Sequence, residues 1–67
     1  LERYDLDPRR EKPFCNGLGT GERRHVPETD ILRVYGAGRF LGIGRYDRRS
    51  QEVIPAKVVC REPATKN

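Results

Sequence analysis

The sequence is poor in the residues that build catalytic and metal-binding centres. Its 67 residues include one histidine, one serine and two cysteines, and no tryptophan or methionine. No CxxC or HxxxH spacing is present, so a structural zinc site is not expected. His25 is the sole imidazole and Ser50 lies in a polar turn, which argues against a hydrolytic triad. We therefore expect no catalytic residue, metal or cofactor in this chain.

Long apolar stretches are also missing. No run approaches the ~18 residues that a membrane span needs, and no charged-then-apolar signal segment is present. A chain of this length forms one domain with a small core. Because it begins at Leu1 rather than Met, we expect a fragment of a longer cytosolic protein or a processed chain. We also expect a cytoplasmic monomer without a membrane partner.

The two cysteines, Cys15 and Cys60, lie far apart in the sequence. One disulfide is conceivable, but small secreted domains stapled by disulfides usually carry four or more cysteines. We therefore expect two free, largely buried thiols.

Positive charge is concentrated in the second half of the chain. Residues 1–32 hold six basic and seven acidic side chains, whereas residues 33–61 hold seven basic and two acidic ones. Arginine dominates, and its planar guanidinium suits phosphates and base edges. This asymmetry favours a nucleic-acid partner, although a mildly basic, solvated surface is an equally good interpretation.

The strongest structural signal is a β-hairpin over residues 32–46. Two runs of β-branched and aromatic residues flank Gly36-Ala37-Gly38, which predicts a tight turn. A third β run covers residues 53–60, where Pro55 indicates an edge, a bulge or a strand start. We expect continuous pairing over residues 56–60, and a short strand is possible over residues 23–26.

The N-terminal part reads as an extended lead-in followed by a short helix. Asp7 is a typical N-cap and Pro8 a typical first helical residue. Pro13 either ends this helix after one turn or lets it restart, and Asn16-Gly17 closes it. Phe14 is its expected anchor in the core. The chain is thus mainly β, and it is expected to curl into a small barrel or pseudobarrel.

Strict alternation in the second hairpin strand places Phe40, Gly42, Gly44 and Tyr46 on one face. RNA backbone or bases could approach the bare glycines between two rings. The alternative is that the glycines let another element pack closely, with Phe40 in the core, and for Phe40 we favour the core. The densest basic cluster is Arg45, Arg48 and Arg49, followed by Lys57, and it is either a solvated turn or a phosphate-contacting patch. The candidate RNA-binding residues are the two glycines, this cluster and one further arginine. They are Arg39, Arg45, Arg48, Arg49, Lys57, Gly42 and Gly44.

Several of these pieces together resemble a known family. Asn16-Gly17, Leu32-Arg33-Val34-Tyr35, Gly38-Arg39-Phe40-Leu41-Gly42-Ile43-Gly44, Asp47 and Pro55-Ala56-Lys57-Val58-Val59 follow one another. In order and spacing they are similar to the C-terminal domain of bacterial tRNA pseudouridine synthases of the TruB type, which modify the T-loop uridine.

The resemblance implies a PUA-like pseudobarrel with one short N-terminal helix. Residues 1–17 would lead in from an absent catalytic domain, residues 18–60 would form the PUA-like domain, and residues 61–67 would be a flexible tail. The implied function is tRNA binding that helps position uridine for isomerisation by the catalytic domain of the parent chain, which needs no cofactor. This chain alone would not be an enzyme. The alternative is a small β-barrel that acts as a structural or protein-interaction module without RNA contact.

Overall fold

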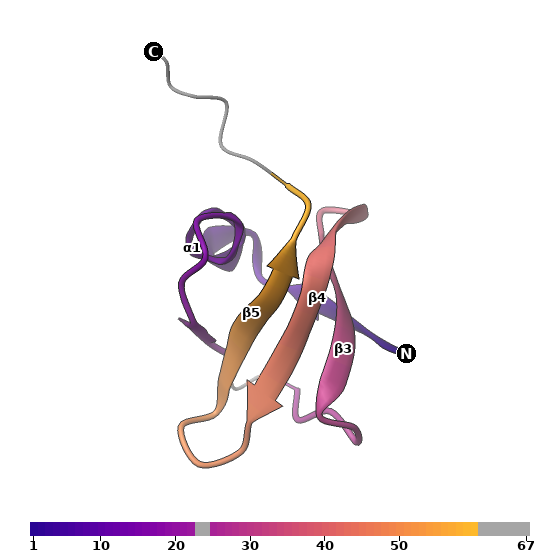
Figure 1. Ribbon diagram of the computed structural model, residues 1–67, viewed down its shortest axis with the longest axis vertical. Coiled ribbons are helices and arrows are strands. Elements are labelled where there is room, and N and C mark those ends of the chain that lie inside the picture. The colour runs from indigo at the N-terminus through magenta and orange to yellow at the C-terminus, as the bar shows by residue number, and fades with distance from the viewer. Residues whose placement is uncertain (23–24, 61–67) are drawn as a thin grey trace.

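The computed structural model describes residues 1–22 and 25–60. Five strands form one curled, half-barrel sheet in the order β1-β3-β4-β5-β2, with β1 parallel to β3 and the other pairs antiparallel. The strands are β1 (Glu2–Leu6), β2 (Thr20–Gly21), β3 (Ile31–Gly36), β4 (Arg39–Asp47) and β5 (Glu52–Val58). Figure 1 shows β3, β4 and β5 side by side, with β1 crossing behind them. The predicted mainly β, barrel-like architecture with one short helix is confirmed.

The predicted hairpin is present as β3 and β4. Ala37 and Gly38 form the turn, and both have positive φ, at 52° and 78°. Positive φ at both central residues is typical of the turns whose twist matches that of the flanking strands. The turn therefore fixes the register in which Gly36 lies opposite Arg39.

A β-bulge in β4 changes which side chains face the core. Val34 lies opposite Gly42 and Tyr35 opposite Phe40, so Leu41 is an extra residue between the two pairs. Such an insertion reverses the alternation of side chains along the strand. Leu41 is fully buried, whereas Phe40 is 39% exposed. The prediction that Phe40 lies in the core was wrong, because strict alternation did not allow for the bulge.

The N-terminal segment belongs to the same core as the hairpin. β1 extends the sheet through its pairing with β3 and buries Tyr4 and Leu6. The predicted N-cap is confirmed, since the Asp7 carboxylate accepts a hydrogen bond from the Arg9 amide at 2.9 Å. A 3₁₀ turn (η1, Pro8–Arg10) leads into α1 (Glu11–Cys15). Pro13 lies inside α1 and does not end it, because a residue in the first helical turn has no amide partner to lose.

The end of α1 is a Schellman motif, as Asn16-Gly17 predicted. Gly17 has φ of 82°. Its amide donates to Phe14 O at 3.0 Å, and the Leu18 amide donates to Pro13 O at 2.9 Å. The predicted anchor is also confirmed, since Phe14 is fully buried.

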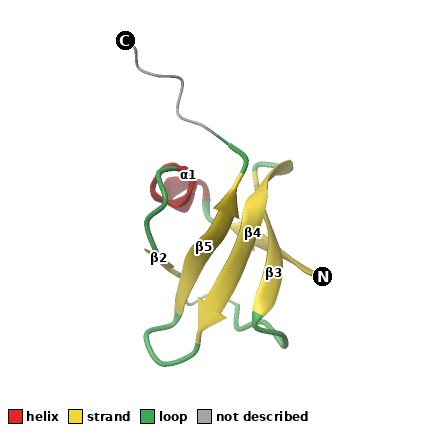
Figure 2. Ribbon diagram, viewed as in Figure 1, coloured by secondary structure: helices red, strands yellow, loops and turns green. Residues whose placement is uncertain are grey.

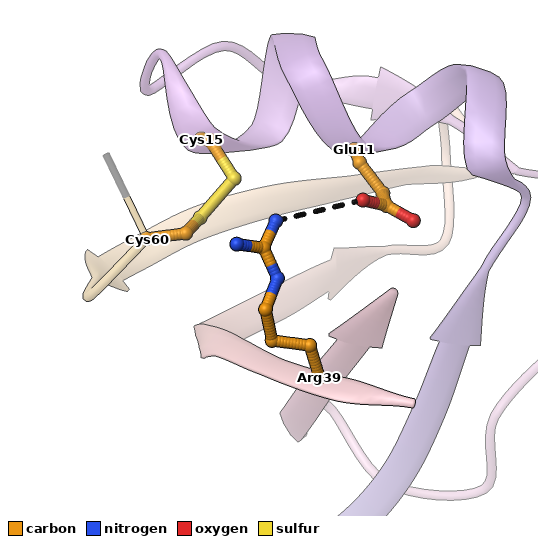
Figure 3. Close-up of a disulfide and its surroundings, with 4 residues drawn as sticks. All are labelled: Glu11, Cys15, Arg39 and Cys60. Atoms are coloured by element: carbon orange, nitrogen blue, oxygen red, sulfur yellow. Dashed lines mark ion pairs between the residues drawn. A yellow bond between two sulfur atoms is a disulfide. The ribbon is translucent and has the colours of Figure 1, made fainter. Parts of the chain in front are cut away.

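A disulfide joins Cys15, the last residue of α1, to Cys60, which follows β5. The expectation of two free thiols was therefore wrong. Two cysteines alone gave no spacing from which to infer a bond, but the fold brings their Cα atoms to 5.5 Å, within the range that a disulfide requires. Figure 3 shows this bond between α1 and the chain beyond β5.

The core fills the inner, concave side of the sheet. Its members come from four strands, α1 and the segment after β5: Tyr4, Leu6, Phe14, Leu32, Val34, Leu41, Tyr46, Val53 and Cys60. The short helix closes one end of this core beside β5, as Figure 2 shows in red. Nine buried hydrophobic side chains among the described residues form the small core expected for a chain of this length.

The third β run is present, but its pairing differs from the prediction. β5 pairs over Glu52–Val58, with an irregularity beyond Pro55, which lies opposite Gly44. Pro55 thus marks a bulge, one of the three predicted possibilities. Continuous pairing over residues 56–60 was wrong, because the Val59 and Cys60 amides both donate to Leu41 O, at 2.9 and 3.2 Å.

Two predicted segments lie partly or wholly outside the described residues. Of the possible strand over residues 23–26, only His25 and Val26 are described, and neither is in a strand. The predicted flexible tail, residues 61–67, is not described. Over residues 1–22 and 25–60, neither helical segment has the length and hydrophobicity of a transmembrane helix.

Candidate nucleic-acid interface

The convex side of the sheet, opposite the core, carries a mixture of rings, apolar side chains and cations. We call this surface the outer face. Register and burial place on it Arg3 and Asp5 from β1, Ile31, Arg33 and Tyr35 from β3, Phe40, Ile43, Arg45 and Asp47 from β4, and Glu52, Ile54 and Lys57 from β5. No element among the described residues is packed over this surface. It therefore remains accessible to a ligand.

One end of the outer face is hollowed. A depression of about 440 Å³ is lined by Asp30, Arg45, Tyr46, Asp47, Arg48, Arg49 and Ile54. The hollow brings together three of the predicted RNA-binding residues, namely Arg45, Arg48 and Arg49. They meet because β4 ends where the polar turn to β5 begins, and because the loop before β3 lies beside that end.

Two carboxylates in the hollow already have roles in the fold. Asp30 accepts a hydrogen bond and ion pair from Arg48 at 3.0 Å. Asp47 accepts from the backbone amides of Arg49 and Ser50, at 2.9 and 3.4 Å, which stabilises the turn. Arg45 and Arg49 are exposed and form no ion pair with any residue that the structure describes. Those two guanidinium groups remain available for an anion.

An aromatic pair lies at the other end of the outer face. Tyr35 and Phe40 are opposite each other on β3 and β4, with ring centroids 5.5 Å apart in an edge-to-face arrangement. The Arg3 guanidinium lies over the Tyr35 ring at 4.0 Å, and that of Arg33 lies at 5.9 Å. Asp5 holds Arg3 through side-chain hydrogen bonds of 3.0 to 3.2 Å, which raise the pKa of Arg3.

The other predicted residues are divided between the two sides of the sheet. Lys57 lies on the outer face, opposite Ile43. Arg39 instead points to the helix side, where its guanidinium lies 3.7 Å from the Glu11 carboxylate (Figure 3). The predicted cations thus do not form one continuous patch, and Arg39 is separated from the rest.

Gly42 and Gly44 are buried, and they serve close packing between strands rather than an open RNA approach. A Cβ at Gly42 would lie 2.1 Å from Lys57 O, and φ there is +150°. A Cβ at Gly44 would lie 2.9 Å from Val34 Cγ2 and 3.1 Å from Val53 Cγ1. The sequence left open whether these glycines admit RNA or close packing of another element, and the structure supports close packing between strands.

Three residues of the outer face, Arg3, Arg33 and Tyr35, are not among those predicted to bind RNA. Alternation does place Arg33 and Tyr35 on one face of the first hairpin strand, which was an available signal. The position of Arg3 had no such signal, because its parallel pairing with β3 joins segments that are about thirty residues apart in the chain.

Titratable groups in the described part of the chain do not form a catalytic or metal-binding arrangement. No group of three or more His, Cys, Asp or Glu side chains there could hold a metal ion. Burial raises the pKa of Glu2, but hydrogen bonds from the Thr29 amide and hydroxyl and from the Glu28 amide outweigh it, so the pKa lies below its ordinary value. This carboxylate anchors the loop before β3 and takes no part in the outer face.

Comparisons with protein-family models, with curated proteins and with solved structures found no match to this chain.

Proposed function

We propose that this chain is an RNA-binding domain that contacts phosphates through the outer face of its sheet. The observation that carries this proposal is the convergence of Arg45, Arg48 and Arg49 around one hollow. Two of these guanidinium groups have no carboxylate partner among the described residues, and Arg guanidinium groups bind phosphate through paired hydrogen bonds. Lys57 extends the positive charge along the same face.

The specific ligand proposed is tRNA, on the strength of the resemblance described above. In that setting the domain is the PUA-like C-terminal part of a TruB-type tRNA pseudouridine synthase. It helps to hold tRNA while a preceding catalytic domain of the parent chain isomerises uridine. The domain itself then contributes binding and orientation, and it acts as a monomer without a cofactor.

The disulfide counts against one element of this proposal, the cytoplasmic location. Cytosolic thiols are kept reduced, and stable disulfides are typical of oxidising compartments. A cytoplasmic domain would therefore contain Cys15 and Cys60 as thiols at 5.5 Å Cα separation. The pairing of Arg39 with Glu11 and of Arg48 with Asp30 favours the second candidate function, a structural or protein-interaction module without RNA contact.

Binding of tRNA to the 67-residue chain across a salt series distinguishes the two functions. Phosphate contacts release counterions, so the logarithm of the affinity should fall with the logarithm of the salt concentration, with a slope of about −0.7 to −0.9 per neutralised phosphate. Fluorescence anisotropy with labelled tRNA measures this slope. Affinity that does not change with salt, or no binding at low salt, would favour the structural module.

A further inference from the structure

The aromatic end of the outer face has features that phosphate binding does not need. Phe40 is 39% exposed, although a phenylalanine ring is normally buried. The bulge at Leu41 places it there, opposite Tyr35. One ring therefore remains open to solvent on a surface that also carries cations.

The surroundings of this ring identify the kind of partner that would cover it. Arg3 and Arg33 lie on one side, over Tyr35, and Lys57 and Arg45 lie along the same face. The Asp5 carboxylate on this face forms an ion pair with Arg3. Ile43 lies between Arg33 and Lys57 in the register, so cations flank this apolar side chain on both neighbouring strands. A protein partner with an apolar surface is thus a poor match, whereas an anionic ligand with flat π-systems is a good one.

The geometry of Tyr35 and Phe40 decides which ring is available. One face of Tyr35 is covered by the Arg3 guanidinium at 4.0 Å, so Tyr35 is already stacked. Phe40 meets Tyr35 edge to face at a 61° interplanar angle, so the Tyr35 ring supports the Phe40 ring from one side. Phe40 is therefore the pre-positioned stacking surface, with Tyr35 as its support.

We propose that Phe40 is a stacking platform for an unpaired base of single-stranded RNA, while the phosphates of the same strand occupy the cationic hollow. This inference rests on the proposed RNA-binding function and adds that the recognised RNA is single-stranded. The platform and the hollow are separated by the length of β4 between Phe40 and Arg45, about 16 Å at the usual rise per residue. Bases within a duplex cannot reach the ring, because they are stacked and paired with one another.

The test uses all 67 residues of this chain and three probes. The probes are a uridine oligoribonucleotide, an abasic oligomer with the same number of phosphates, and an RNA duplex of the same strand length. The uridine oligomer is expected to bind about tenfold more tightly than the abasic one, the gain typical of base stacking. The Phe40→Leu variant should lose this gain and leave the abasic affinity unchanged. Because Phe40 contributes little to the core, this variant should have the same melting temperature as the unsubstituted chain.

A second variant reports stacking directly. The chain has no tryptophan, so Phe40→Trp introduces a single indole whose fluorescence a stacked base should quench. Quenching by the uridine oligomer but not by the abasic oligomer supports the platform.

Equal binding of the uridine and abasic oligomers, or tighter binding of the duplex, would overturn the single-strand inference and leave phosphate binding intact. Binding of none of the three probes would overturn the proposed function together with this inference. Capture of an acidic protein in place of all three would identify the outer face as a protein-docking surface.

Discussion

The two faces of the sheet differ in how completely the chain covers them. The inner face is closed by α1, which carries Phe14, and by the disulfide, and the core side chains on it are at most 8% exposed. The outer face leaves an aromatic ring and several cations in contact with solvent. In so small a domain, stability must come almost entirely from the inner face. The outer face can then vary for binding at little cost to the fold.

The largest expected effect concerns the covalent closure of the inner face. Replacing both cysteines, Cys15→Ser with Cys60→Ser, removes a link across a sequence separation of 45 residues. Loss of this link should lower the free energy of unfolding by about 4 kcal/mol, a large part of the stability of a small domain. Thermal unfolding of the unsubstituted 67-residue chain, with and without a reductant, checks this prediction. An identical melting temperature under both conditions would contradict the role given to the disulfide.

Substitution of Gly42, where β4 packs closely against β5, should destabilise the fold almost as much. A methyl group there would collide with Lys57 O and would also require a positive φ, so Gly42→Ala should cost about 3 kcal/mol. Gly38→Ala is the matched control, because φ there is +78° but nothing lies within 4 Å. It should cost about 1 kcal/mol. Equal losses for the two variants in chemical denaturation would show that β4 and β5 do not pack as closely as described.

Charge removal from the outer face should affect binding and spare the fold. The double change Arg45→Ser with Arg49→Ser should weaken tRNA binding about tenfold at low salt and reduce the salt slope by about 1.5, the value for two phosphate contacts. Arg39→Ser removes one cation from the opposite side of the sheet and should leave both quantities nearly unchanged. A comparable loss of affinity in Arg39→Ser would mean that binding depends on overall charge and not on the outer face.

Two stacked tyrosines on the inner face allow a finer test of the core. Tyr4 OH donates a hydrogen bond to His25 O, whereas the buried Tyr46 OH has no partner among the described residues. Removing an unpaired buried hydroxyl relieves a desolvation cost. Tyr46→Phe should therefore raise the free energy of unfolding by about 1 kcal/mol and Tyr4→Phe should lower it by about 1 kcal/mol. Equal effects in urea unfolding would contradict this difference.

The smallest effect is a pH dependence at Glu2, whose carboxylate does not belong to the outer face. Its pKa is lowered in the folded chain from the ordinary 4.5, so its contribution is present above that value and is lost as the pH falls through the folded pKa. Glu2→Gln should therefore lower the melting temperature slightly at neutral pH and leave it unchanged in strong acid. The reverse pattern across a pH series would show that Thr29 and Glu28 do not stabilise the ionised form.

Local signals allowed the hairpin, the helix start at Asp7, its end at Gly17 and the burial of Phe14 to be predicted. Each depends on residues within a few positions of one another, where turn and cap chemistry is specific. The candidate site was predicted in part: the arginines around the hollow follow from their clustering near one turn, whereas Arg39 lies on the other side of the sheet.

Features that depend on distant segments were not predictable in the same way. The pairing of β1 with β3 and the meeting of Cys15 with Cys60 come from the tertiary fold. The bulge at Leu41 is a local feature without a distinctive residue signal, and it moved Phe40 from the expected core to the outer face. That single inserted residue created the open ring on which the single-strand inference depends.

The most direct test that the outer face binds RNA and the inner face does not is an NMR titration. The ¹⁵N-labelled 67-residue chain is titrated with the uridine oligoribonucleotide. The account predicts amide shift changes along the outer face, at Tyr35, Phe40, Ile43 and Arg45, and in the turn at Arg49. Amides of α1 should be unaffected. Shift changes confined to α1, or no shift changes at low salt, would contradict the assignment of the outer face as an RNA-binding surface.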